Sequence, residues 1–180
     1  MQTYDIRGVR ADARRTRERL QPALLDRLTD AAPRSRAEFD SVQSIDAAGL
    51  RETVLRDLAW LLNTTCVLDA TQEACYGEVA CSVVNYGIAP LAGTCMSEID
   101  ARRLEEMLRL AIVRFEPRLL PDSVEVRCIA DSAQGGVRHN VLTFEIAASL
   151  WGPSGPTPMV IRADLDLESG VASLHTLAER

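Results

Sequence analysis

The sequence predicts an α+β fold, in which an antiparallel β-meander of about three to four strands packs against two main helices. Two stretches in the first two thirds of the chain repeat apolar residues at helical spacing, and the last third alternates apolar and polar residues with a period of two. A chain of 180 residues with 47% apolar content can bury a core without metal or disulfide bonds. We therefore expect a single domain, residues 45–180, preceded by an arginine-rich N-terminal arm, residues 1–44.

The first predicted helix runs from about Ala48 to Leu62. Its apolar residues recur at the spacing of a helix that buries one face. They are Leu50, Val54, Leu58 and Leu61, with Leu55 and Leu62 beside them. Asp46 is a candidate N-cap, and the Asn-Thr-Thr sequence at residues 63–65 ends the helix, because short polar side chains compete for backbone hydrogen bonds.

The second predicted helix opens at Ser97, with Asp100 three residues later in a variant of the capping box. Its apolar stripe consists of Leu104, Met107, Leu108, Ala111 and Phe115. Pro117 closes this helix, because proline has no N–H to donate and disfavours the helical conformation of the residue before it. Between the two helices, residues 66–93 have no clear period, so we expect a loop with short strand or turn pieces.

The last third of the chain predicts strands. Apolar and polar residues alternate over residues 124–130, 142–150 and 159–167. The two linkers between these stretches are too short for crossover helices, so neighbouring strands should pair antiparallel. A turn then leads into a short terminal segment, residues 171–177. Polar residues along the third strand indicate that one face of the sheet is solvated while the other packs on the helices.

Charge is distributed unevenly along the chain. All 20 basic residues are arginine, and the formal charge is +4 for residues 1–36 and −10 for residues 37–180. A basic arm on an acidic body suggests docking against an acidic protein surface, with a solvated arm held by local ion pairs as the alternative. Nucleic acid is not expected as a partner, because the net charge is −6 and only 4% of the residues are aromatic.

No stretch of the sequence resembles a secretory leader or a membrane span. The first 20 residues contain six arginines and no apolar run, and no later stretch approaches the roughly 18 apolar residues that a span needs. We therefore expect a soluble, cytoplasmic protein without direct membrane insertion.

The chemistry-bearing residues do not form a recognisable catalytic or metal-binding pattern. The five cysteines are Cys66, Cys75, Cys81, Cys95 and Cys128. Their odd number and the lack of a C-x-x-C motif favour buried free thiols. Only His139 and His175 could supply imidazole ligands, so no metal or cofactor is expected. The sequence contains no G-x-S-x-G, H-E-x-x-H or phosphate-loop motif, so no catalytic residue is predicted.

Glu116, Pro117 and Arg118 lie at the junction between the second predicted helix and the first predicted strand. A charged pair that flanks a proline is held in a geometry that the chain cannot easily relax. The two charged side chains can bridge to each other or to buried backbone groups, or they can face a partner as a charge-assisted contact. Alternatively, Arg118 simply interacts with the negative end of the helix dipole.

Four segments carry a resemblance to a known family. They are L-L-D-R-L at residues 24–28, L-R-D-L-A-W-L-L-N-T at 55–64, S-V-V-N-Y-G-I at 82–88 and F-E-P-R-L-L at 115–120. In this order they resemble the baseplate wedge proteins of contractile injection machines, the family with an E-P-R signature that includes the type VI secretion subunit TssE and a phage protein long labelled lysozyme-like. The resemblance spans residues 22–167, and residues 65–78 with their cysteines depart from the family pattern.

The resemblance implies a structural role and no enzymatic activity. Residues 45–180 would be a TssE-like wedge domain that joins the TssF and TssG wedge to the first ring of the TssB and TssC sheath, in a cytoplasmic assembly docked at the membrane. In this family a sheath strand can be added to the sheet, which then acts as a template for sheath assembly. Glu116, Pro117 and Arg118 would lie close to this protein contact. The alternative is the wedge protein of a phage tail or of another contractile device.

The lysozyme-like label of the family raises a peptidoglycan hydrolase as a less expected alternative. Glycoside hydrolysis needs two carboxylates about 5 to 9 Å apart across a sugar-binding cleft. The candidate carboxylates are Asp69, Glu73, Glu78 and Glu116. Sugar clefts also favour aromatic platforms, and only eight aromatic residues are spread over the chain.

Overall fold

The computed structural model describes residues 20–29, 34, 45–91, 100–129, 141–152 and 155–177. The chain divides into two compact units, Met1–Leu50 and Arg51–Arg180. All the buried hydrophobic residues of the described part belong to the second unit, which also contains the whole sheet. The predicted boundary between an arm and a wedge domain at residues 44 and 45 stays a prediction.

The described residues of the first unit form a short helix, α1 (Leu24–Leu28), and the start of helix α2. Leu20 and Ile45 form an isolated antiparallel bridge, in which each backbone N–H donates to the other residue's carbonyl oxygen, over 3.0 and 2.8 Å. The predicted N-cap of α2 is confirmed, because Asp46 Oδ1 accepts a hydrogen bond from the backbone N–H of Gly49 over 2.9 Å.

The two long helices, α2 (Ala47–Leu62) and α5 (Ala101–Phe115), correspond to the two stretches with helical apolar spacing. The buried residues are Val54, Leu58, Leu61 and Leu62 in α2, and Leu104, Leu108, Ala111 and Ile112 in α5. The N-cap of α5 is Asp100, whose Oδ1 accepts the N–H of Arg102 over 3.0 Å. The predicted start at Ser97 lies outside the described residues.

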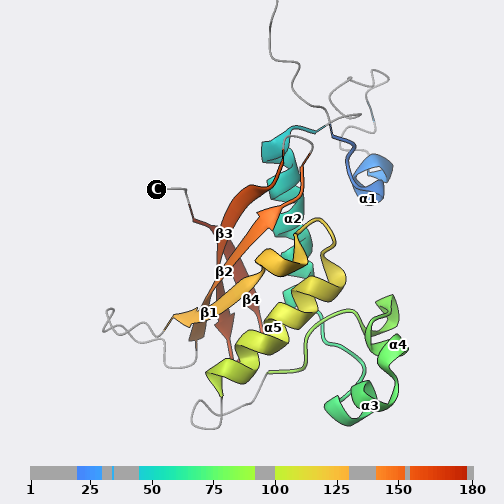
Figure 1. Cartoon of the computed structure of the whole chain (residues 1–180), viewed down its shortest axis with the longest axis vertical. Coiled ribbons are helices and arrows are strands. Elements are labelled where there is room, and N and C mark those ends of the chain that lie inside the picture. The colour runs from blue at the N-terminus through green and yellow to red at the C-terminus, as the bar shows by residue number, and fades with distance from the viewer. Residues whose placement is uncertain are drawn as a thin grey trace, which may run out of the picture. The chain divides into compact units, whose positions relative to one another are not determined.

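Four strands form one antiparallel sheet in the order β1-β2-β3-β4 (Figure 1). They are β1 (Glu125–Ile129), β2 (Val141–Leu150), β3 (Thr157–Asp166) and β4 (Ala172–Thr176). The predicted α+β class and the antiparallel meander are confirmed. The terminal segment predicted after the third strand supplies the fourth strand.

The sheet has one buried face and one polar face. Along β3 the buried residues are Met159, Ile161, Ala163 and Leu165, and the residues between them are partly exposed. On the polar face, Thr143 donates its hydroxyl to Asp164 Oδ1 over 2.6 Å, and Arg162 Nε donates to the same oxygen over 3.2 Å. The structure therefore confirms that one face of the sheet packs on the core while the other carries charge.

The stretch between α2 and α5 was predicted as a loop with short strand or turn pieces, but it contains short helices. They are α3 (Ala70–Cys75), α4 (Gly77–Ala80) and the 3-10 helix η3 (Val83–Asn85). A capping box starts α3, because Asp69 accepts the N–H groups of Thr71 and Gln72 while Gln72 Oε1 accepts the N–H of Asp69. Helices this short do not produce a helical period in the sequence, although the capping box itself is a readable signal. A strand-like piece also occurs, as an isolated parallel bridge between Thr65 and Ile88.

Candidate interaction site

The E-P-R sequence forms the turn that leads from α5 toward β1. Glu116 leaves the helical conformation, with φ −118° and ψ 81°, while its N–H still donates to the carbonyl oxygen of Ile112 over 2.9 Å. The carbonyl oxygen of Arg118 accepts the N–H of Trp151 over 2.8 Å. The turn is therefore tied at one end to α5 and at the other to the residue that follows β2.

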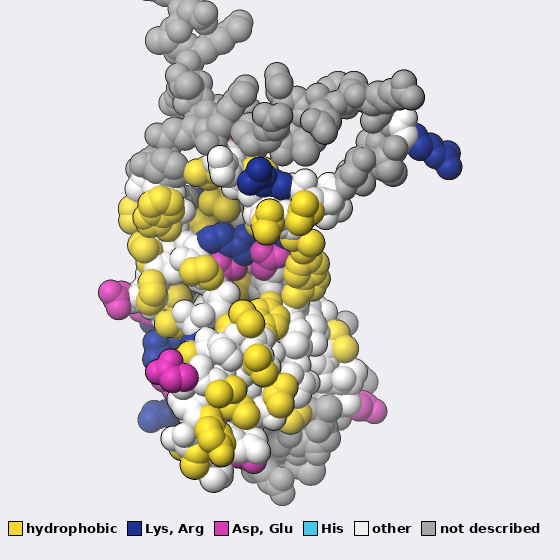
Figure 2. Space-filling view, turned by 90° about the vertical axis from the view of Figure 1, so that its right-hand side faces the viewer, with side chains coloured by type: hydrophobic (Ala, Val, Ile, Leu, Met, Phe, Trp, Pro, Cys, Tyr) yellow, Lys and Arg dark blue, Asp and Glu magenta, His cyan; other side chains and the backbone are white. Residues whose placement is uncertain are grey.

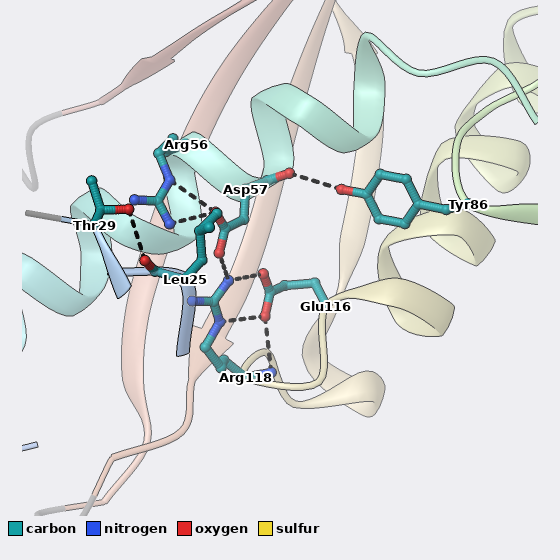
Figure 3. A network of polar contacts seen from close by, with 7 residues as sticks. All are labelled: Leu25, Thr29, Arg56, Asp57, Tyr86, Glu116 and Arg118. Atoms are coloured by element: carbon teal, nitrogen blue, oxygen red, sulfur yellow. Dashed lines mark hydrogen bonds and ion pairs between the residues drawn. The ribbon is translucent and has the colours of Figure 1, made fainter. Parts of the chain in front are cut away.

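Arg118 binds two carboxylates that come from different elements (Figure 3). Its Nε and Nη2 atoms donate to the two oxygens of Glu116 over 2.7 and 2.5 Å, and its backbone N–H donates to Glu116 Oε1 over 3.1 Å. The same Nη2 atom donates to Asp57 Oδ2, on helix α2, over 2.6 Å. Arg118 thus joins helix α2 to the turn after α5.

This cluster of charges is largely removed from water. Glu116 is only 3% exposed, and the side chains of Arg118 and Asp57 are 26% and 23% exposed. Desolvation by itself lowers the pKa of Arg118, but the hydrogen bonds and negative charges of Glu116 and Asp57 outweigh it and raise that pKa well above its ordinary value. Arg118 is therefore permanently charged, and it neutralises a carboxylate that would otherwise be buried without a partner.

Two further contacts extend the cluster along α2. Arg56 donates to Asp57 Oδ1 from Nη2 and Nε, over 2.8 and 3.0 Å, and its guanidinium carbon lies 4.7 Å from the centre of the Trp60 ring. Tyr86 donates its hydroxyl to the backbone carbonyl of Asp57 over 3.3 Å, and its ring meets that of Phe115 edge-on at 5.4 Å. Burial and the nearby charges of Asp57 and Glu116 raise the pKa of the Tyr86 hydroxyl.

Part of the cluster still faces outward. Within the described part of the chain, Arg118 Nη1 has no hydrogen-bond acceptor, and no dashed line reaches it in Figure 3. Pro117 is exposed, and the chain's two tryptophans, Trp60 and Trp151, are 47% and 62% exposed. Trp and Arg are enriched at the energetic centres of protein interfaces, so this surface has the composition of a protein contact.

The N-Y-G turn holds the helices α3 and α4 in place. Asn85 is 1% exposed, and its Oδ1 accepts the N–H groups of Val67 and Leu68 over 3.1 and 2.9 Å. Its Nδ2 donates to Glu73 Oε1 over 3.0 Å. Gly87 has φ +129°, and a Cβ at this position would collide with the backbone of Thr64. The asparagine of this turn is therefore explained by its side-chain hydrogen bonds, and the glycine by the backbone geometry.

Three of the segments used for the resemblance meet in this one cluster. Asp57 comes from the L-R-D-L helix, Tyr86 from the N-Y-G turn, and Glu116 and Arg118 from the E-P-R turn. The sequence places Glu116, Pro117 and Arg118 together because they are consecutive, but it does not indicate that Asp57 is the partner of Arg118. The joint occurrence of the three segments was the available signal for this contact.

The β1 edge of the sheet is shielded by helix α5. Cys128 directs its backbone N–H away from β2, and this group donates to Glu105 Oε1 on α5 over 2.7 Å. Figure 1 shows α5 running alongside β1. A side chain that binds an outward N–H blocks the pairing of another strand at that point, so β1 is a poor edge for strand addition.

The β4 edge is blocked at one end and open at the other. Leu177 donates its N–H to the carbonyl oxygen of Val160. In an antiparallel pair every second residue directs its N–H and C=O groups to the partner strand. Counting back from Leu177, the backbone groups of Thr176, Leu174 and Ala172 therefore lie on the side away from β3. The Asn63 side chain binds both of these groups of Ala172. Its Oδ1 accepts the N–H and its Nδ2 donates to the carbonyl oxygen, each over 2.9 Å. Within the described residues, the backbone groups of Leu174 and Thr176 have no partner, so they form an open strand edge.

Three of the four carboxylates considered for hydrolysis have structural partners, and the fourth, Glu78, is exposed. Asp69 caps α3, Glu73 binds Asn85 and lies 3.5 Å from Arg114, and Glu116 is enclosed by Arg118. Within the ranges that the structure describes, no group of three His, Cys, Asp or Glu side chains could hold a metal ion.

The expectation of buried thiols is wrong for two cysteines. Cys75 and Cys81 are exposed, because Cys75 ends α3, which has no buried residue, and Cys81 follows α4, in which only Ala80 is buried. Cys66 and Cys128 are partly buried, and Cys95 lies outside the described residues. In the part of the chain that the structure describes, no helix combines the length and the apolar character needed to cross a bilayer.

Comparisons with known proteins agree with this arrangement. A family model described as "Baseplate wedge protein gp25" matches residues 48–154, which include α2, the N-Y-G turn, α5, the E-P-R turn and the first two strands. No curated protein and no solved structure matches the chain. The matched region covers more than half of the chain and contains the whole Asp57–Glu116–Arg118 cluster, so the chain belongs to the family of the baseplate wedge protein gp25, a family of structural baseplate components.

Proposed function

We propose that the chain is the baseplate subunit of a type VI secretion system that links the TssF and TssG wedge to the first TssB and TssC ring of the contractile sheath. Family membership establishes the baseplate role, and the four TssE-like segments favour the secretion machine. The proposed location is the cytoplasm, in a baseplate docked at the membrane. The subunit acts by binding and not by catalysis.

The observation that carries this proposal is the open edge of β4. A template for sheath assembly must offer unpaired N–H and C=O groups to an incoming strand, and Leu174 and Thr176 offer them on the side away from β3. Because α5 and Glu105 shield β1, we propose that a sheath strand is added at β4.

The E-P-R turn is proposed to form a second part of the protein contact. The exposed Pro117 and Trp151 supply apolar surface, and Arg118 Nη1 supplies a charged donor for a carboxylate or a backbone carbonyl of the partner. Glu116 is buried, so in this proposal it orients Arg118 and does not itself touch the partner.

Co-expression tests the proposal in two steps. The tagged chain should co-purify with TssF and TssG of the same bacterium, and the resulting wedge should assemble TssB and TssC into a sheath that is visible by electron microscopy. Thr176→Pro removes the outward N–H and disturbs no bond to β3, so it should block the sheath step and leave the wedge intact. Thr176→Ala keeps the N–H and is the matched control.

Each failure has a different meaning. If TssF and TssG do not co-purify, the secretion-system assignment is wrong, and the wedge of a phage tail or another contractile device is the remaining candidate. If Thr176→Pro supports sheath assembly as well as Thr176→Ala does, strand addition at β4 is wrong. Clearing of a peptidoglycan zymogram by the purified chain would favour the hydrolase.

A further inference from the structure

The segment that carries α3, α4 and η3 exposes an unusual amount of apolar surface. Five large apolar side chains of this segment are exposed, and together they are called the valine patch. They are Val67, Tyr76, Val79, Val83 and Val84, with exposed fractions of 71%, 60%, 38%, 85% and 66%. Figure 2 shows hydrophobic side chains gathered over the lower part of the face, where α3 and α4 lie in Figure 1. Exposed apolar side chains that concentrate in one segment are typical of an interaction site.

The valine patch is not required for the packing of its own segment. The interior of the segment is supplied by Ala80, Asn85 and Ile88, which are 2%, 1% and 6% exposed. Val83 and Val84 are consecutive in η3, and both are exposed although the next residue, Asn85, is buried. The hydrogen bonds of Asn85 to Val67, Leu68 and Glu73 hold the segment in shape, so the patch is a preformed surface.

The charged residues within this segment are all acidic, and Arg114 of α5, which reaches the segment, is paired there with Glu73 over 3.5 Å. The chain contains no arginine and no lysine between Arg56 and Arg102, although it has 20 arginines in all. Asp69 lies two residues after Val67 and Glu78 lies directly before Val79, and both acidic residues are exposed. An anionic membrane surface would be repelled by this charge, whereas an apolar peptide segment with basic flanks would be attracted.

We propose that the valine patch is a docking surface for an amphipathic helix of another protein, with apolar side chains on one face and arginine or lysine on its flanks. The backbone of α3, α4 and η3 offers no strand edge, so recognition must use side-chain packing. The surface is distinct from the β4 edge and from the E-P-R turn, and the proposal does not depend on either of them.

Synthetic peptides test this binding on the full chain. The probe is an amphipathic peptide of about four helical turns with leucines on one face and arginines on its flanks, and the matched probe carries glutamate in place of each arginine. In fluorescence anisotropy at physiological salt, the arginine peptide should bind at least about tenfold more tightly than the glutamate peptide. Vesicles of phosphatidylcholine and phosphatidylglycerol should bind wild type and Val83→Glu equally, because any attraction to anionic lipid comes from the arginine-rich residues 1–36 and not from the patch.

Two variants locate the binding. Val83→Glu places a charge in the centre of the patch, and it should weaken binding of the arginine peptide at least about tenfold. Because this variant makes the chain more acidic, a loss of affinity must come from lost apolar contact and not from charge. The control is Val171→Glu, which adds the same charge at a site that is 52% exposed and outside the patch. Equal peptide binding by Val83→Glu and wild type, equal binding of the two peptides, or vesicle binding that Val83→Glu abolishes would each overturn the proposal.

Discussion

Arg118 and Asp57 are 61 residues apart in sequence, yet the Nη2 atom of Arg118 donates to Asp57 Oδ2 over 2.6 Å. This contact joins α2 to the E-P-R turn, and the backbone of the turn is bonded to Trp151 at the end of β2. The guanidinium group of Arg118 therefore adds a link between helix α2 and a turn whose backbone is bonded to the sheet. A change at Arg118 should affect the stability of the fold as well as any contact that Arg118 makes with a partner.

Arg118→Ala is expected to lower the free energy of unfolding by about 3 kcal/mol, because it leaves the Glu116 carboxylate buried without a partner. Urea denaturation measures this loss. Arg127→Ala is the matched control, since the Arg127–Glu125 pair is 74% and 63% exposed, and it should change stability by less than about 0.5 kcal/mol. Glu116→Gln combined with Arg118→Ala should recover part of the loss. Equal effects of Arg118→Ala and Arg127→Ala would contradict a buried role for the cluster.

The contrast between what the sequence predicted and what it missed has a physical cause. Apolar periodicity reports which face of an element is buried, so α2, α5 and the strands of the meander could be predicted. Apolar periodicity does not report which polar side chains contact one another, so the pairing of Asp57 with Arg118 could not be predicted. Which edge positions are blocked depends on Glu105 of α5 and on Asn63, the residue after α2, and nothing in the strand sequences identifies these two side chains.

Gly87→Ala is expected to destabilise the chain by at least about 2 kcal/mol, because φ is +129° and a Cβ would collide with the backbone of Thr64. Thermal or urea unfolding provides the measurement. Gly77→Ala serves as the control, since no atom lies within 4 Å of a Cβ placed there, and it should leave stability unchanged or raise it slightly. The backbone account of the N-Y-G turn fails if the two variants behave alike.

Thr143→Val should remove a pH-dependent contribution to stability. Burial raises the pKa of Asp164, but the hydrogen bonds from Thr143 and Arg162 outweigh it and hold this pKa below its ordinary value of 3.8. Because the pKa is lower in the folded state, the stabilisation is fully present above pH 3.8 and is lost as the pH falls through the folded pKa. At neutral pH the variant should be about 1 kcal/mol less stable than wild type. The difference should disappear in strong acid, and a difference that is independent of pH would exclude the linkage.

The cysteines should differ in their rates of alkylation. Desolvation raises the pKa of the Cys66 and Cys128 thiols. The negative charge of Glu73 adds to this effect at Cys66, and that of Glu105 adds to it at Cys128. A smaller fraction of these two cysteines is therefore present as the reactive thiolate. Cys75 and Cys81 are exposed. With iodoacetamide near pH 8, mass spectrometry should find Cys75 and Cys81 modified at least about tenfold faster. Similar rates at all four sites would show that the burial of Cys66 and Cys128 does not control access.

Asn63→Ala is expected to loosen β4. The Asn63 amide replaces a neighbouring strand at Ala172, because it accepts the N–H and donates to the C=O of this residue over 2.9 Å each. Its removal should cost about 1 to 2 kcal/mol of stability and should speed amide hydrogen exchange at Ala172. Asn63→Asp keeps the acceptor and loses the donor, so the exchange rate of the Ala172 N–H should stay closer to wild type.

The same variant separates edge protection from stability. With Asn63→Ala, the open edge of β4 extends from Leu174 back to Ala172, so an added strand could form one more pair of hydrogen bonds. The purified Asn63→Ala variant should therefore self-associate more readily than wild type, as measured by light scattering. Gly87→Ala leaves the β4 edge unchanged and is the control. When the two variants are compared at the same folded fraction, Gly87→Ala should not self-associate more than wild type. If Asn63→Ala stays as monodisperse as wild type although exchange at Ala172 is faster, then the β4 edge does not pair with external strands.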